Sequence, residues 1–156
     1  MDEDPPPTST PVPPVAKPSV PVVLDLEWEG DLRFRGASGA VSLVLDSDGQ
    51  AGPSPVQALA FALAGCMSVD LVHILAKGRL QLQALRAHLE AERHPEDPKR
   101  LVRVRLHFVV AGNLPPDRVE RAIALSREKY CSVWHSLRPD IDFRTSFAVA
   151  GGHPTT

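Results

Sequence analysis

The chain is poor in cysteine: Cys66 and Cys131 are the only two among 156 residues. Secreted scaffolds that depend on disulfide bonds are short and dense in cysteine, so this composition excludes that class of protein. Two thiols kept reduced in a cytosol fit better, and we therefore expect a cytoplasmic protein. Whether the pair is two inert core residues or a reactive couple depends on the rest of the sequence.

The chain also lacks an excess of positive charge, with 17 basic and 19 acidic residues and a formal net charge of -2. Without a basic surface there is little long-range attraction for phosphates, so we expect no nucleic-acid partner. The sequence contains no internal repeat and no glycine-rich phosphate loop. These absences favour small-molecule chemistry.

A long uninterrupted apolar run is missing too. Residues 49–69 carry no charge, but glycine, proline and polar residues interrupt them before roughly 20 apolar residues can follow one another, so we expect no membrane span. Half of the 16 prolines lie in residues 1–21, which begin with acidic residues, unlike a signal peptide. We expect a disordered tail over 1–21, one domain over 22–151 and a short tail over 152–156.

Hydrophobic periodicity predicts the elements of that domain. Apolar residues alternate over 22–28, 32–34 and 41–45, which indicates three short strands with turns at 30–31 and 36–39. A long helix follows, with Ser54 as N-cap, Pro55 at its first position and a stop at Lys77 and Gly78. The helix is apolar on nearly every side, so we expect protein to surround it, from another subunit as well as from its own sheet.

Strands are predicted again over 85–91 and 102–110, joined by a hairpin loop at 94–99. The sequence then indicates an amphipathic helix within 114–130, a short helical piece over 131–137 that Pro139 ends, and a final strand over 141–149. The order βββ-α-ββ-α-α-β has strands in groups and does not alternate strand with helix. This favours an α+β fold with largely antiparallel sheets around a buried central helix.

Two segments resemble a known family. GPSPVQALAFALAGCMSVDLVHIL carries Cys66 and EKYCSVWHSL carries Cys131, and together with the element order they resemble the OsmC/Ohr family, named for osmotically inducible protein C and organic hydroperoxide resistance protein. The resemblance covers roughly residues 24–150 and is stronger to the OsmC-like branch, because of the Lys-Tyr-Cys block. It implies the OsmC/Ohr fold and an intertwined homodimer with active sites between the subunits.

The resemblance also implies an enzyme, a cysteine-based peroxidase that reduces organic hydroperoxides in oxidative-stress defence. It makes Cys66 the peroxidatic and Cys131 the resolving cysteine, with Arg33 as the cation that lowers the pKa of the thiol and Arg35 as the second choice. A Cys66–Cys131 disulfide would form and a dithiol reductant would open it. No cofactor is expected.

Other residues suit a hydrophobic substrate, and one departs from the family. Gln57, Phe61, Met67 and Trp134 are candidate substrate-binding residues, and an ordinary core role is the alternative for the three apolar ones. The family places a glutamate in the first turn of the cysteine helix to hold the arginine, whereas this chain has Val56 and Gln57. A neutral amide holds a guanidinium less strongly than a carboxylate does. We therefore predict a weaker peroxidase, with Gln57 near the site.

Three further readings remain open. One is a non-catalytic protein of the same fold that binds a small apolar ligand, and another is an interaction role for the proline-rich tail. A metal site could be built from the helical stripes that carry the two cysteines with neighbouring Asp70, His73 and His135. The spacing lacks the close Cys/His pairs typical of zinc sites, so we expect no metal, and Asp70 is expected to orient nearby donors.

Overall fold

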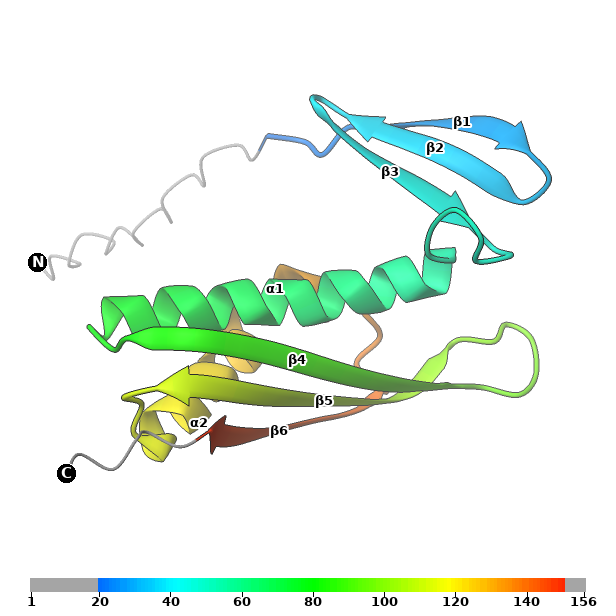
Figure 1. Ribbon diagram of the computed structural model, residues 1–156. Coiled ribbons are helices and arrows are strands. Elements are labelled where there is room, and N and C mark those ends of the chain that lie inside the picture. The colour runs from blue at the N-terminus through cyan, green and yellow to red at the C-terminus, as the bar shows by residue number, and fades with distance from the viewer. Residues whose placement is uncertain (1–19, 151–156) are drawn as a thin grey trace, which may run out of the picture.

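The computed structural model describes residues 20–150. The tail predicted over 1–21 lies outside the described residues except for its last two positions, and the tail over 152–156 lies outside them altogether. Within this range the element order is the predicted βββ-α-ββ-α-α-β, with one extra helical turn before the last short helix. The strands form two separate three-stranded sheets (Figure 1).

The first sheet is an antiparallel meander of β1 (Asp25–Gly30), β2 (Arg33–Ser38) and β3 (Val41–Asp46). The turn after β1 is where the sequence predicts it, because Gly30 and Asp31 both adopt positive φ. The predicted turn at 36–39 is wrong for its first residues. Gly36 lies inside β2, and the chain reverses at Gly39, which has φ +57°.

The two faces of this sheet differ in character. Trp28 pairs with Phe34 and Leu45 lies opposite Phe34, so these side chains share one apolar face with Leu26 and Leu43. A Cβ at Gly36 would meet Leu26 Cδ2 at 3.2 Å, so this glycine leaves room for the leucine. Around it lies an apolar hollow of about 280 Å³, and several of its side chains are exposed in the single chain.

The central helix α1 (Pro55–Lys77) begins and ends as the sequence predicts. The Ser54 side chain accepts a hydrogen bond from Gln57 N, and the Gln57 side chain accepts one from Ser54 N at 2.9 Å, a complete capping box. Lys77 is in the last turn and Gly78 caps the helix. Both ends are fixed by residues within four positions of them, and for this reason the sequence specifies the helix well.

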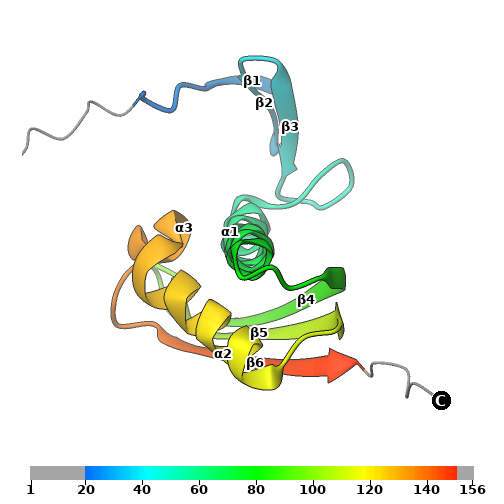
Figure 2. The ribbon, with the colours of Figure 1, turned by 90° about the vertical axis from the view of Figure 1, so that its left-hand side faces the viewer.

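The second sheet consists of β4 (Leu82–Arg93), β5 (Leu101–Gly112) and β6 (Asp142–Ala150). β4 and β5 form the predicted antiparallel hairpin, but β6 runs parallel to β5, which limits the prediction of antiparallel sheets. A parallel pair needs a long crossover, and the helices between β5 and β6 supply it. They lie beside α1 on the same face of the sheet (Figure 2).

That crossover contains three helical pieces where the sequence predicts two. α2 (Pro116–Leu125) continues into a π-helical turn, η1 (Ser126–Tyr130), and α3 (Ser132–His135) follows directly. The pattern within 114–130 indicates one helix because a π turn inserts a single extra residue into the ladder without changing the composition. This turn ends immediately before Cys131.

The core lies between α1, the crossover helices and the inner face of the second sheet. Leu63, Met67, Leu71 and Leu75 form the buried stripe of α1 and pack against inward-facing residues of β5 such as Phe108. By length and composition α1 could cross a membrane, but these four residues belong to the core cluster of the domain.

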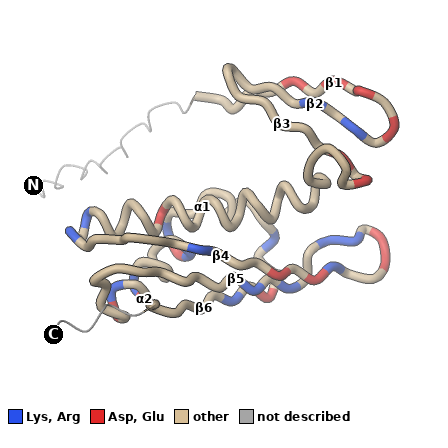
Figure 3. The backbone as a smooth tube through the Cα atoms, in the orientation of Figure 1, with Lys and Arg blue, Asp and Glu red and all other residues tan. Residues whose placement is uncertain are grey.

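The opposite side of α1 is not covered by the residues that the structure describes, 20–150. Phe61 is 70% exposed and Val69 56% exposed, with Val72 and Leu59 also accessible. The prediction that protein surrounds this helix is therefore met on one side only, since the first sheet extends away from it (Figure 1). Figure 3 shows few charges along α1, whereas charges gather at the β4–β5 loop and on β5 and β6.

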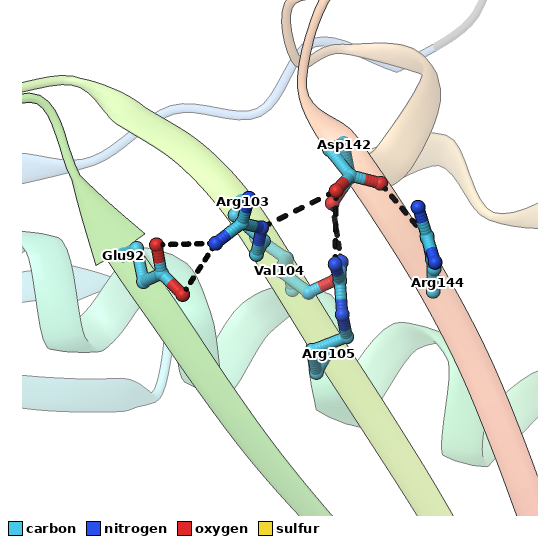
Figure 4. Close-up of polar contacts among 6 residues, drawn as sticks. All are labelled: Glu92, Arg103, Val104, Arg105, Asp142 and Arg144. Atoms are coloured by element: carbon cyan, nitrogen blue, oxygen red, sulfur yellow. Dashed lines mark hydrogen bonds and ion pairs between the residues drawn. The ribbon is translucent and has the colours of Figure 1, made fainter.

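The outer face of the second sheet carries a network of ion pairs around Asp142 (Figure 4). Arg105 Nη2 donates to its carboxylate at 2.9 Å, and Arg103 Nε and Arg144 Nε donate at 3.3 and 3.2 Å. Arg103 also bridges to Glu92 on β4 at 2.8 Å. The network thus joins all three strands. Led by the Arg105 hydrogen bond, these contacts lower the pKa of Asp142 to about 2.

We expect an Asp142→Asn variant to melt a few degrees below the parent near neutral pH. An aspartate whose pKa is lower in the folded than in the unfolded chain stabilises the fold above its unfolded value of about 3.9, and this contribution is lost as pH falls toward 2. Thermal melts from pH 7 to pH 2 should therefore converge for the two proteins. Parallel curves over that range would show that the ionised carboxylate contributes nothing.

Candidate thiol site

Folding brings the two cysteines together from distant parts of the chain. Cys66 lies in the middle of α1, and Cys131 is the N-cap of α3. Both thiols are free, and their sulfur atoms and a carboxylate oxygen of Asp70 all lie within 4.8 Å of one another. The sequence-predicted pair is therefore close in space.

The two thiols have different surroundings. Cys66 is half-buried and within 3.9 Å of the Ser132 hydroxyl, so its sulfur is open to approach. Cys131 is fully buried and accepts a hydrogen bond from the Trp134 backbone N–H at 3.4 Å. A solute can therefore approach Cys66 more easily than Cys131, which is shielded from solvent.

Burial raises the pKa of the Cys131 thiol to about 11, and the neighbouring Cys66 and Asp70 add to this rise. The hydrogen bond from Trp134 opposes the shift but does not cancel it. Cys131 is therefore protonated at neutral pH. It is therefore a poor first nucleophile, and its properties fit a thiol that reacts in the second step.

Ser126 holds two members of the site at once. Its hydroxyl donates to Asp70 Oδ2 at 2.7 Å, and its carbonyl accepts the Cys131 N–H at 2.8 Å through the π turn. The side chain is fully buried, so this carboxylate contact is shielded from solvent. The π turn thereby fixes where Cys131 lies relative to α1, consistent with the occurrence of such turns at functional sites.

Trp134 contacts the site through its backbone N–H, which donates to Cys131 Sγ. Its ring packs on Phe143 of β6, with centroids 4.4 Å apart. Met67, a second candidate substrate residue, is fully buried in the core. Phe61 and Gln57 lie instead toward the start of α1, where they help to line a separate hollow of about 270 Å³ against β4. The four candidate substrate residues thus do not form a single surface within one chain.

The candidate cations belong to the first sheet. Arg33 Nη2 contacts Asp46 at 3.2 Å, and Arg35 pairs with Glu29. Burial opposes ionisation of Asp46, but hydrogen bonds from Ala51, Asp48 and Arg33 more than compensate and lower its pKa. The two arginines lie on the same face of the first sheet, because they are two residues apart on β2. Within one chain this sheet lies apart from the helices that carry the thiols (Figure 2).

The chain is similar to proteins of a known family. A family model described as OsmC-like protein matches residues 47–146. The protein YhfA of Escherichia coli K12 is 37% identical over 127 residues, which cover 80% of this chain and 95% of YhfA. The chain belongs to the OsmC-like protein family. The predicted family is confirmed.

Solved structures agree with this OsmC-like fold. A hypothetical protein from Aquifex aeolicus VF5 superposes with a TM-score of 0.79 and 25% identity, covering 85% of this chain and 98% of its own. An organic hydroperoxide resistance protein OsmC from Legionella pneumophila gives a TM-score of 0.65 and 18% identity, with 85% and 100% covered. At the latter identity the likeness establishes the fold alone.

Two serines of this OsmC-like chain belong to the thiol site but are not among the residues that the sequence predicts there. Ser132 contacts Cys66, and Ser126 orients Asp70 and Cys131. Ser126 does leave a signal, because it continues the apolar stripe of Val119, Ala122 and Ile123 at helical spacing and is therefore a polar residue at a core position. His73 and His135 are exposed and lie outside the thiol cluster.

Proposed function

We propose that this OsmC-like protein is a cysteine-based peroxidase that reduces organic hydroperoxides. The observation that carries the proposal is the juxtaposition of a half-buried thiol, Cys66, with a fully buried one, Cys131. An accessible sulfur can attack a solute, and a shielded sulfur beside it can then close a disulfide. The hydroperoxide-resistance protein among the similar structures is consistent with this chemistry.

The proposed reaction has three steps. The Cys66 thiolate attacks the terminal peroxide oxygen, the O–O bond breaks, and the alcohol leaves with a proton while Cys66 becomes a sulfenic acid. Cys131, as its thiolate, then attacks the Cys66 sulfur, forming the S–S bond and expelling hydroxide, which becomes water. A dithiol reductant finally opens this bond by two thiol–disulfide exchanges and becomes oxidised itself.

We further propose that the active form is a homodimer in the cytoplasm. In one chain Arg33 is held on a sheet apart from the thiols, so a second copy is the proposed source of the cation beside Cys66. Bare apolar surfaces on α1 and on the first sheet support such a partner. Gln57, which replaces the family glutamate, already uses its carbonyl oxygen in the capping box, so we expect it to hold an arginine weakly.

The direct test is intact-mass measurement after one equivalent of cumene hydroperoxide. The reduced protein should lose about 2 Da as two hydrogens leave to form the Cys66–Cys131 disulfide. A dithiol should restore the original mass. If the protein binds the hydroperoxide but keeps its mass, the non-catalytic ligand-binding role replaces the peroxidase role.

Disulfide closure should depend on pH in a defined direction. Because burial raises the pKa of Cys131 to about 11, its thiolate fraction grows with pH throughout the neutral range. The rate of closure should rise about tenfold for each unit between about pH 7 and 9. Stopped-flow tryptophan fluorescence of a Trp28→Phe protein, in which Trp134 beside Cys131 is the remaining tryptophan, can follow this step. A flat profile would mean that Cys131 is already ionised when it reacts.

A further inference from the structure

Three possible metal ligands converge at the thiol site. Asp70 places a carboxylate oxygen within 4.8 Å of both sulfurs. One positive ion placed among these three atoms would attract two thiolates and the carboxylate together.

We propose that the reduced site binds a thiophilic divalent metal ion, of which Zn²⁺ is the prototype, through Cys66 Sγ, Cys131 Sγ and one oxygen of Asp70. Two thiolates and a carboxylate are accepted zinc ligands, and three protein ligands leave the fourth tetrahedral position for water. The site keeps Cys66, Asp70 and Cys131 from the set suggested by helical spacing and leaves out the exposed His73 and His135.

The geometry requires only a small contraction. With Zn–S bonds of about 2.3 Å, two tetrahedral sulfur ligands lie about 3.8 Å apart. The ligand atoms are already within 4.8 Å of one another, so side-chain rotation of Cys66 and Asp70 can complete the site. Cys66 and Asp70 lie four residues apart, on successive turns of one face of α1. The helix therefore fixes the relative positions of their backbones.

Hydrogen bonds of the buried Ser126 orient two of the proposed ligands, Asp70 and Cys131. Ser126 donates to Asp70 Oδ2 and so holds the carboxylate, and its carbonyl fixes the backbone of Cys131. Groups that hold metal ligands in this way usually strengthen metal affinity. Ser126 is fully buried, and its hydroxyl is committed to this contact.

Metal binding would exclude peroxide chemistry at the same atoms. Each thiol gives its proton to the buffer as it becomes a ligand, so binding strengthens with pH, and no electron is transferred. A metal-bound Cys66 is unavailable to a hydroperoxide, and a Cys66–Cys131 disulfide cannot bind the metal. The metal proposal nevertheless does not depend on the peroxidase proposal, because it needs only reduced thiols.

Co²⁺ titration of the reduced full-length protein tests the site directly. We expect one equivalent to bind, with tetrahedral ligand-field bands and sulfur-to-metal charge-transfer absorption, and Zn²⁺ should displace it. Cys66→Ser should lose the charge-transfer intensity in part and weaken affinity at least about a hundredfold. Asp70→Asn should keep that absorption and weaken affinity about tenfold. Circular dichroism checks that each variant is folded.

The matched control is a pair of histidines away from the thiols. His88 and His107 lie opposite each other on β4 and β5, and two neighbouring imidazoles can take up adventitious metal. A His88→Ala/His107→Ala protein should bind Co²⁺ as the parent does. Loss of binding in that variant, or binding without sulfur bands in the parent, would overturn the metal proposal. Neither result would bear on peroxide-driven disulfide formation, which the mass measurement reports separately.

Discussion

Replacing Cys66 with serine is expected to abolish hydroperoxide turnover, with a fall in rate of at least about a thousandfold. Cys66 is the accessible sulfur, and Cys131 is fully buried with a pKa raised to about 11, so Cys131 cannot substitute for it at neutral pH. The coupled oxidation of a dithiol such as dithiothreitol, with cumene hydroperoxide as oxidant, measures this rate.

Cys131→Ser is the matched variant and should behave differently. A serine hydroxyl can still accept the Trp134 N–H, so the cap of α3 is retained and the variant should fold. It should consume one equivalent of hydroperoxide, stop at the Cys66 sulfenic acid, and react with dimedone. If Cys131→Ser lost the first equivalent while Cys66→Ser kept it, the assignment of the two roles would be reversed.

Mixing inactive variants can show whether two chains share a site. If a partner's Arg33 acts on Cys66, dimers that pair an Arg33→Ala chain with a Cys66→Ser chain contain one complete site. Subunit exchange between the two variants should then restore up to roughly a quarter of the parent activity. No recovery after demonstrated exchange would place the required cation elsewhere.

The sequence is most informative where structure depends on neighbouring residues. The ends of α1 follow from Ser54, Gln57 and Gly78, all close to the residues they cap, and the Gly30–Asp31 turn follows from local backbone freedom. The pairing of Cys66 with Cys131 came from family likeness, because nothing in their spacing alone brings α1 and α3 together. The structure then supplies the proximity that the likeness implies.

The sequence does not predict features that depend on contacts between residues far apart in the chain. The direction of β6 is set by the length of the helical crossover, and an alternating strand reads the same in either direction. The Ser126 contact with Asp70 joins residues of two helices, and the π turn leaves no compositional trace. The proposed approach of Arg33 to the thiol of a second chain involves residues of two chains, and hydrophobic periodicity within one chain does not relate them.

Leu43→Asp is expected to convert the proposed dimer to monomer. Leu43 lies on the apolar face of the first sheet, beside the hollow around Gly36, and is 49% exposed in the single chain. A carboxylate buried there against a second copy would have no partner, and this should weaken self-association at least about a hundredfold. Light scattering after size-exclusion chromatography, over a range of concentrations, measures the shift.

Arg86→Asp provides the control on the second sheet. Arg86 is exposed on β4, and because it precedes the core-facing Ala87 its side chain points to the outer face of that sheet. This variant should keep the parent mass in solution. If the peroxidase site is completed by a second chain, Leu43→Asp should also lose turnover while Arg86→Asp retains it, even though both leave the Cys66 and Cys131 side chains unchanged. A fully active Leu43→Asp monomer would mean that one chain holds everything the reaction needs.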